Sequence, residues 1–433
     1  MPKKVLIVAY YWPPAGGPGV QRWLKFVKYL PEFDIVPTVI IPENPAYPIV
    51  DEDLKAGIGT ATTIVQLPIR EPLRWASTLS RKQSQNIASG LIPDENKQSF
   101  LQKAMLYIRG NFFIPDARIF WVRPTVRYLE SYIEEHQFDT IITTGPPHSV
   151  HLIGLNLKKK FKNKLRWLAD FRDPWTTISY HGKLRMGKRA QAKHKELEHK
   201  VLTTADEIIV TSPATQKDFI TLTAKPVHLI TNGYDDRAEA VVQNDASTFT
   251  IAHIGSLLSD RNPRVLWEVL RNCIDDDPDF KISFKLLLAG RVSKDALDTI
   301  SNYALDDHLD FKGYVSHREA QELQAKATIL LLIEADDDSG KSIIAGKVYE
   351  YLSASKPILA IGPKDGDVGT IIRKTETGTY AHYDQYNLVK TEILKQFEAF
   401  KNGDSAYTPN NIAAFHRKSL TKNLAEIITK RKA

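Results

Sequence analysis

The stretch Ser339-Gly-Lys-Ser-Ile-Ile-Ala-Gly-Lys-Val-Tyr-Glu-Tyr-Leu-Ser-Ala-Ser-Lys-Pro-Ile-Leu-Ala-Ile-Gly362 decides the predicted fold. An apolar run at residues 328–333 precedes it, and another at 357–361 lies near its end. Each run is typical of a buried strand in a parallel sheet. Parallel strands need a crossover connection, so the residues between the two runs are predicted to form a helix. The sequence therefore predicts an α/β unit at this place.

Glycines and lysines gather at the start of the predicted helix. Gly340 and Gly346 allow the backbone to approach a ligand, while Lys341 and Lys347 add positive charge. A helix N-terminus beside cations suits a diphosphate group. Glu350 lies one turn further and is placed to bind a ribose hydroxyl pair. The alternative is a helix that packs on a sheet and carries an ordinary solvated glutamate.

This stretch resembles the donor-site signature of GT-B glycosyltransferases, specifically the large retaining family 4 with its Glu-x7-Glu pattern. Glu350 stands at the second Glu of the pattern, and Ser342 replaces the first. The resemblance implies two Rossmann-like α/β domains that face each other across a cleft. It also implies a nucleotide diphosphate sugar as donor, bound in part at positions 341, 342, 346, 347 and 350.

Length and composition favour a two-domain globular protein. A chain of 433 residues is too long for one compact core, and its apolar share of 42% is ordinary for a soluble protein. Cys273 is the only cysteine, which excludes an internal disulfide and a thiolate metal cluster. No apolar run is long enough to span a bilayer, and the N-terminus lacks a signal-peptide cleavage site. We expect a cytoplasmic location, including the cytosolic face of a membrane.

Charge is divided unevenly along the chain. Residues 1–200 contain 30 Lys and Arg against 18 Asp and Glu, whereas residues 201–400 contain 21 against 31. This predicts two domains with different partners, and the basic half suits an anionic membrane surface. Residues 106–115 mix aromatic and basic side chains, as interfacial segments do, although the same aromatics would also suit a core. Nucleic acid is not expected, because no known nucleic-acid-binding signature is present.

A glycine-rich turn follows the first predicted strand. Residues 4–10 read as a strand, and Pro13-Pro-Ala-Gly-Gly-Pro-Gly19 leads into a helix, as in the first half of a Rossmann-like unit. The spacing is not G-x-G-x-x-G, which argues against NAD. The family resemblance implies that the backbone amides of Gly16 and Gly17 approach the donor phosphate. A tight strand-to-helix turn is the alternative.

His148 follows the next clear strand, predicted at residues 138–143. Open α/β sheets bind ligands at the carboxyl ends of their strands, so this position favours a catalytic role. A lone histidine that only forms structural hydrogen bonds is the alternative.

Three charged residues follow the strand predicted at residues 165–169, in the motif Asp170-Phe-Arg-Asp-Pro-Trp175. Charges at such a site persist only if they are paired or used. The motif resembles one in bacterial family members that build surface polysaccharides. It predicts that Asp170 or Asp173 orients the acceptor hydroxyl, and that Arg172 fixes this carboxylate or meets a phosphate. An internal Asp–Arg pair that holds the loop is the alternative.

The second domain is predicted to begin after a polar linker at residues 235–248. A strand at 249–254 leads to a turn that contains Gly255 and Arg261. The family pattern here is Gly-Arg-Leu followed by Lys-Gly. Arg261 takes the place of the lysine, whereas a serine replaces the arginine. The resemblance implies that Gly255 and Arg261 contact the donor diphosphate; a solvent-exposed arginine at a helix start is the alternative.

Three consecutive aspartates, Asp336 to Asp338, raise the hypothesis of a metal site. Glycosyltransferases of the GT-A fold hold Mg²⁺ or Mn²⁺ with an Asp-x-Asp pair. These aspartates, however, precede a helix entrance, where acids and turn formers are expected in any case. We therefore predict no metal and no other cofactor.

Together these observations predict an acceptor-binding domain at residues 1–230 with an insertion at about 43–115. A donor-binding domain at 231–405 and a C-terminal helix at 406–433 that returns to the first domain complete the chain. The predicted function is metal-independent, retaining transfer of a hexose to a glycan or lipid-linked acceptor in surface polysaccharide synthesis. The alternatives are a non-hydrolysing nucleotide-sugar epimerase and a non-catalytic, membrane-associated nucleotide-sugar-binding protein.

Overall fold

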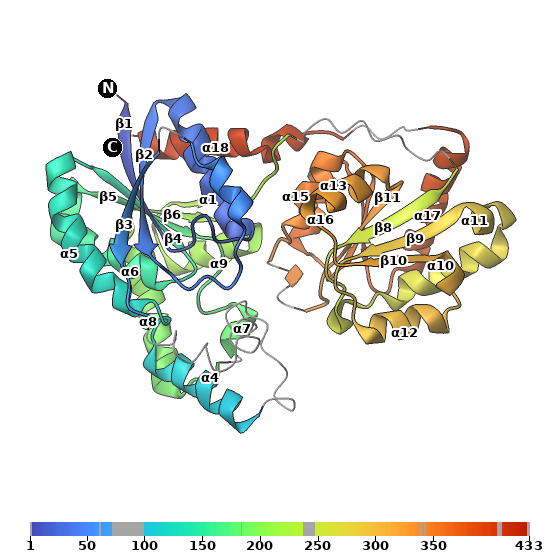
Figure 1. The fold of residues 1–433 in the computed structure, drawn as a ribbon, viewed down its shortest axis with the longest axis horizontal. Coiled ribbons are helices and arrows are strands. Elements are labelled where there is room, and N and C mark those ends of the chain that lie inside the picture. The colour runs from blue at the N-terminus through green and yellow to red at the C-terminus, as the bar shows by residue number, and fades with distance from the viewer. Residues whose placement is uncertain are drawn as a thin grey trace. The chain divides into compact units, whose positions relative to one another are not determined.

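The computed structural model describes residues 2–59, 62–71, 99–182, 184–236, 247–337, 340–341, 343–404 and 409–430. The chain divides into two compact units, residues 1–232 with 417–433 and residues 233–416. Each unit contains one parallel sheet with helices on both faces (Figure 1). The predicted fold class, two Rossmann-like α/β domains, is confirmed.

The first unit is built on a seven-stranded parallel sheet with the order β3-β2-β1-β4-β5-β6-β7. The direction of winding reverses between β1 and β4, and ligands of open α/β sheets bind at such a point, beyond the carboxyl ends of the strands. The strands are β1 (Lys3–Ala9), β2 (Ile35–Glu43), β3 (Thr63–Pro68), β4 (Thr140–Gly145), β5 (Arg166–Phe171), β6 (Glu207–Val210) and β7 (Val227–Leu229).

Alternate side chains of β1 enter two different cores, as the pleat of a doubly covered strand requires. Leu6 and Val8 pack with α5, α6, α8 and α9, whereas Val5 and Ile7 pack with α1 and α18. The helices are α1 (Pro18–Tyr29), α4 (Phe100–Phe112), α5 (Ile119–His136), α6 (Ser149–Phe161), α7 (Ser179–Gly182), α8 (Lys188–Thr204), α9 (Pro213–Leu222) and α18 (Arg417–Thr429), with short 3-10 turns η1 (Leu30–Phe33), η2 (Glu52–Gly57) and η4 (Lys162–Lys164).

The C-terminal helix α18 belongs to the first unit. Leu420, Leu424 and Ile428 are buried in the same core as α1. Arg166, at the start of β5, donates to the carbonyl oxygens of Ile427 at 2.6 Å and Ile428 at 2.8 Å. These bonds satisfy carbonyl groups that the end of a helix leaves without partners. The last helix therefore completes a sheet that begins at the other end of the chain.

Leu424→Ala is expected to lower the free energy of unfolding of the first unit by about 2–5 kcal/mol, because a fully buried leucine leaves a cavity. Urea denaturation followed by tryptophan fluorescence would measure the loss. Lys422→Ala, an exposed position on the same helix, is the matched control and should change little. Equal effects of the two substitutions would contradict the packing of α18 on α1.

The second unit has a six-stranded parallel sheet with the order β10-β9-β8-β11-β12-β13. Here the winding reverses between β8 and β11, which places the expected ligand site of this unit at their carboxyl ends. The strands are β8 (Phe249–Ile254), β9 (Phe284–Ala289), β10 (Leu309–Gly313), β11 (Ile329–Ile333), β12 (Ile358–Gly362) and β13 (Gly378–His382).

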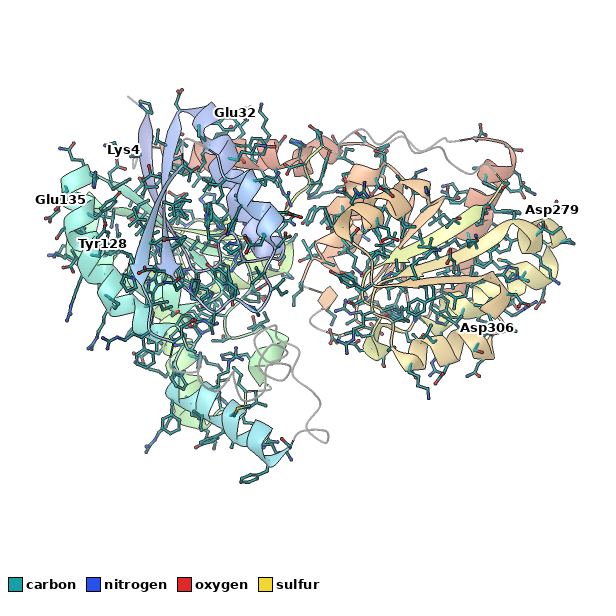
Figure 2. All side chains as sticks on the ribbon, viewed as in Figure 1. Lys4, Glu32, Tyr128, Glu135, Asp279 and Asp306 are labelled. Carbon is teal, nitrogen blue, oxygen red and sulfur yellow. The ribbon has the colours of Figure 1, made fainter. Side chains whose placement is uncertain are left out.

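Helices cover both faces of the second sheet, α10, α11, α12 and α17 on one and α13, α15 and α16 on the other. Apolar side chains face the sheet, whereas Asp279 and Asp306 point outward (Figure 2). The helices are α10 (Arg264–Asp276), α11 (Pro278–Ser283), α12 (Lys294–Asn302), α13 (His317–Lys326), α15 (Lys347–Ala354), α16 (Asp367–Thr375) and α17 (Tyr386–Lys401), with 3-10 turns η5 (Ser259–Arg261), η6 (Asp306–His308) and η7 (Ile412–Phe415).

Two element boundaries differ from the sequence prediction in ways that affect the site. Strand β5 continues to Phe171 instead of ending at Ala169, so Asp170 lies inside the sheet, paired with Thr144 on β4. Helix α15 begins only at Lys347. Among the described residues, no helix combines the length and the apolar character needed to cross a bilayer.

Candidate functional site

The end of β8 in the second unit is shaped around the side chain of Lys347. Gly255 follows β8 with φ +139°, a conformation that favours glycine. A Cβ atom at this position would lie 2.1 Å from Lys347 Nζ, so a larger residue would displace the lysine. Lys347 is the first residue of α15. The glycine, the helix start and the amine therefore meet at the point where the sheet reverses its winding.

Arg261, at the end of η5, is the second cation near the carboxyl end of β8. Burial lowers the pKa of Lys347 to about 8, and the charge of Arg261 contributes to this lowering. Within the described residues, neither Arg261 nor Lys347 forms an ion pair, and Arg261 Nε is buried without a hydrogen-bond partner. Two neighbouring cations disfavour each other, and an anionic ligand would relieve this repulsion. The arrangement suits a diphosphate group.

Glu350 lies one turn along α15 from Lys347 and raises the pKa of that lysine. Its Oε2 accepts a hydrogen bond from Gln324 Nε2 at 3.3 Å. Gly346 precedes the helix with φ −55°, which any residue adopts, so its predicted use as a flexible glycine has no conformational basis. Lys341 is exposed and lies before α15, and Ser342 lies outside the described residues. The structure thus groups Gly255, Arg261, Gly346, Lys347 and Glu350, and it leaves the roles of Lys341 and Ser342 as predictions.

The aspartates considered for a metal have protein partners. Asp337 Oδ1 accepts from the backbone N–H of Gly340 at 3.0 Å, and Asp336 Oδ1 lies 3.5 Å from His382 Nε2. Asp338 lies outside the described residues. Among those that are described, no group of three or more His, Cys, Asp or Glu is arranged to hold a metal ion.

Asp170 in the first unit is completely buried and is held by three donors. Arg22 Nη2 donates to its Oδ1 at 3.0 Å, while Trp23 Nε1 and Thr144 Oγ1 donate to its Oδ2 at 2.7 Å and 2.8 Å. Arg22 and Trp23 belong to α1, so the carboxylate ties this helix to the sheet. The geometry favours a structural role for Asp170, and the catalytic role predicted for it remains without support.

Arg172 lies between two turns at the carboxyl edge of the first sheet. Its Nε donates to the carbonyl of Gly145 at 3.3 Å, and its Nη2 donates to the carbonyl of Pro146. A Cβ on Gly19 would lie 1.5 Å from Arg172 Nη1, so the guanidinium rests against the glycine-rich turn. Burial raises the pKa of the neighbouring Asp173, and Arg172 opposes that rise. Arg172 and Asp173 therefore stay candidates at the acceptor side.

The glycine-rich turn itself is less open than the sequence suggests. The N–H of Gly16 donates to the carbonyl of Ile49 at 3.0 Å, so this amide is already used within the first unit. Gly17 adopts φ +109° and precedes α1, and this conformation explains why glycine stands there. The phosphate contacts predicted for the amides of Gly16 and Gly17 both stay predictions, and that of Gly16 would have to replace its bond to Ile49.

His148 is buried beside Trp175 at the carboxyl edge of β4. The two rings stack with centroids 4.9 Å apart and planes inclined by 3°. Neither ring nitrogen has a hydrogen-bond partner among the described residues. Burial, and then the proximity of His151, lowers the pKa of His148 well below 6.5. His148 is therefore a neutral imidazole at pH 7, with one nitrogen that can donate a hydrogen bond and one that can accept.

Sequence reasoning missed several polar residues that the fold brings to these edges. Trp167 Nε1 donates to Thr143 Oγ1 at 2.8 Å, and Thr143 Oγ1 lies 2.9 Å from His151 Nδ1, which orients the second histidine near His148. In the second unit, Glu334 follows β11 directly and is buried. Glu334 could have been predicted from the sequence, because it directly follows an apolar run. The same kind of position was used to predict a role for His148.

Comparisons with known proteins agree with this architecture. Residues 90–238 match the model of Glycosyltransferase Family 4. No curated protein is significantly similar to the chain in sequence. Among solved structures, sucrose-phosphate synthase from Thermosynechococcus elongatus has 14% identity, covers 98% of each chain and gives a TM-score of 0.59. A point mutant of S. aureus TarM, in complex with fondaparinux, alpha-GlcNAc-glycerol and UDP, has 13% identity, covers 99% of this chain and 100% of its own, and gives 0.54.

A Listeria monocytogenes protein described as a UDP-N-acetylglucosamine 2-epimerase is similar too, with 10% identity and a TM-score of 0.53 over 98% of this chain and 95% of its own. At these identities the likeness shows the fold alone. That fold is GT-B, with two Rossmann-like domains.

Proposed function

We propose that this chain, which has the GT-B fold, is a glycosyltransferase that moves a hexose unit from a nucleotide diphosphate sugar to a glycan or lipid-linked acceptor in surface polysaccharide synthesis. The observation that carries the proposal is the pair of cations at the carboxyl ends of β8 and β11, Arg261 and Lys347, which have no ion-pair partner in the described part of the chain. The S. aureus structure that holds UDP together with alpha-GlcNAc-glycerol has the same fold, which supports this choice of ligands.

The chemistry follows from where charge develops. The bond between the anomeric carbon and the diphosphate oxygen breaks while the acceptor oxygen forms a new bond to that carbon. Arg261 and Lys347 stabilise the negative charge that grows on the departing diphosphate, and such preorganised charges are a large catalytic factor. The family resemblance implies retention, so the acceptor attacks on the face that the diphosphate leaves and gives its proton to a departing phosphate oxygen.

Transfer is expected to survive excess EDTA, because two protein cations take the place of a divalent metal at the diphosphate. Transfer of radiolabelled sugar from the donor to a crude lipid acceptor, measured with and without chelator, would test whether activity survives. Complete loss of activity that Mn²⁺ restores would instead assign a metal to the aspartates at 336–338.

The decisive experiment is a thermal-shift screen of UDP-, GDP- and ADP-sugars, followed by mass spectrometry with crude lipid acceptor. Transfer appears as a glycosylated lipid that forms only when donor and acceptor are both present. An epimerase would convert the donor in the absence of any acceptor. A protein that binds none of these nucleotides would be a non-catalytic module, and the proposal would fall.

The exposed side of helix α4 supports the proposal that the protein binds its acceptor at a membrane surface. Its inner side packs on the segment at 184–187, where Gly187 N–H donates to Asn111 Oδ1 at 2.8 Å. Its outer side carries exposed apolar residues near Lys103 and Arg109, which is typical of an interfacial helix. These residues are Phe100 at 88% exposure, Tyr107 at 51%, Ile108 at 45% and Phe112 at 72%.

Phe112→Asp is expected to weaken binding to vesicles that contain phosphatidylglycerol by about tenfold or more, because a phenylalanine side chain leaves the lipid and a negative charge replaces it. Vesicle co-sedimentation would measure the change. Tyr314→Asp, at a residue that is 94% exposed in the second unit, is the control. If both variants bind as the unmodified protein does, α4 is not the contact.

A further inference from the structure

Glu334 stands where the winding of the second sheet reverses. It directly follows β11, whose neighbour β8 ends beside Gly255. Its backbone is held on both sides, because its N–H donates to the carbonyl of Ile361 at 2.9 Å and Tyr383 Oη donates to its carbonyl at 2.6 Å. Its side chain is only 4% exposed. A carboxyl group so deeply buried needs partners that fix its protonation state.

Tyr380 is the side-chain hydrogen-bond partner of the Glu334 carboxyl group. Tyr380 Oη lies 2.9 Å from the carbonyl oxygen of Pro363 and 3.3 Å from Glu334 Oε2. The phenol is the donor in both contacts, and its one hydrogen can point to either oxygen. Burial raises the pKa of Glu334 to about 8 against the opposing hydrogen bond from Tyr380, so the carboxyl group is mostly protonated at pH 7.

Charged groups from other elements also face this side chain. Arg261 from η5 lowers the pKa of Glu334, and Asp367 at the start of α16 raises it. These influences oppose each other, so burial decides the state. Space for the pair is provided by glycine. A Cβ on Gly362 would lie 2.5 Å from Tyr380 Oη and 3.0 Å from Glu334 Oε2. The surroundings thus hold an uncharged acid in one place.

The other carboxyl oxygen, Oε1, has no hydrogen-bond partner within the described part of the chain. This oxygen also keeps some exposure to solvent. An uncharged acid offers this oxygen as a simple acceptor and has no negative charge to repel a diphosphate. Arg261 is near enough to act electrostatically on both Glu334 and Lys347. The group attached to a diphosphate bound at those cations is the sugar.

We propose that Glu334 accepts a hydrogen bond from a hydroxyl group of the donor sugar and so helps to determine which nucleotide sugar the protein takes. The inference rests on the proposed function, because it needs a diphosphate at Arg261 and Lys347. It assigns the sugar moiety to the carboxyl end of β11, with Tyr380 as the residue that positions the acid. A buried acceptor of this kind discriminates strongly against a sugar that lacks the matching hydroxyl.

The test compares a nucleotide sugar with the same nucleotide without its sugar, on the full-length protein. The probes are the best-bound member of UDP-glucose, UDP-galactose, UDP-N-acetylglucosamine, GDP-mannose and ADP-glucose, and the matching nucleoside diphosphate. Affinities come from calorimetry. Glu334→Ala is expected to weaken the binding of the nucleotide sugar about tenfold. The same substitution should weaken the binding of the nucleoside diphosphate by less than about twofold. Equal losses for the two ligands, or no loss for either, would overturn the inference.

Glu334→Gln is the matched variant that keeps the shape and the neutral charge. Its amide group takes the place of the carboxyl group beside Tyr380 Oη, with the amide carbonyl oxygen in the position of Oε1. We expect the affinity for the nucleotide sugar to stay within about threefold of the unmodified protein. A loss as large as that of Glu334→Ala would show that a charged carboxylate is required, which the inference excludes.

The outcomes also separate this inference from the proposed function. If the unmodified protein binds no nucleoside diphosphate and no nucleotide sugar, the proposed function itself fails. The other case is that the nucleoside diphosphate binds while the gain in affinity from the attached sugar is the same with and without Glu334. In that case only the assignment of Glu334 fails.

Discussion

Lys347→Met is expected to weaken the binding of nucleoside diphosphates by about 10- to 150-fold, which corresponds to the loss of a charge-assisted contact of about 1.5–3 kcal/mol. The same substitution should raise the melting temperature of the free protein. Burial and the charge of Arg261 disfavour the protonated amine in the fold, and methionine removes this cost while it fills similar space. Calorimetry with UDP, GDP and ADP, and thermal denaturation without ligand, measure the two effects.

The pH dependence follows from the direction of the pKa shift. Lys347 titrates with a pKa of about 8 in the folded protein, against 10.5 for an unperturbed lysine. Between these pH values the unfolded chain holds a proton that the folded chain has lost, so the free energy of unfolding rises with pH in this window. The methionine variant should lack this rise. Since a bound diphosphate favours the charged amine, nucleotide affinity should fall as pH increases above about 8.

Lys364→Met is the control for both measurements, because Lys364 is a largely exposed lysine of the same unit. It should change neither the melting temperature nor nucleotide affinity appreciably. If Lys347→Met lowered stability and affinity together, the effect would be a folding defect, and the assignment of Lys347 to a diphosphate site would be contradicted.

Asp170→Ala is expected to lower the free energy of unfolding of the first unit by about 3–5 kcal/mol, because it leaves the buried guanidinium of Arg22 without its counter-ion. Trp23 Nε1 and Thr144 Oγ1 lose their acceptor at the same time. Urea denaturation monitored by tryptophan fluorescence would measure the loss. Activity should fall in proportion to the folded fraction, since the carboxylate holds α1 in place.

Asp173→Asn provides the matched control within the same motif. Asp173 has no ion pair or hydrogen bond among the described residues, so stability should change by less than about 1 kcal/mol. If Asp173 acts on the acceptor, transfer is lost while the fold is kept. Should Asp170→Ala instead keep full stability and lose activity alone, Asp170 would be a catalytic residue and the structural role derived from its contacts would be wrong.

The sequence predicted the grouping of residues at the sheet edge of the second unit better than the contacts of Asp170 in the first. Gly255, Arg261 and Lys347 follow or precede recognisable apolar strands, and parallel strands bring their carboxyl ends to one edge whatever the details of packing. Asp170 was placed after its strand, because a charged residue usually ends an apolar run. In the structure β5 continues through it, since Arg22 and Trp23 from another helix compensate the burial of its charge.

By itself, then, the sequence determined the two parallel α/β sheets and the grouping of cations at the second switch point. Both follow from local apolar periodicity and from the rule that connects parallel strands. Only the tertiary structure decided the state of individual polar groups. The Gly16 amide donates to the carbonyl of Ile49, and the raised pKa of Glu334 comes from its burial. Desolvation and hydrogen bonding act between segments that are distant along the chain, so no linear pattern records them.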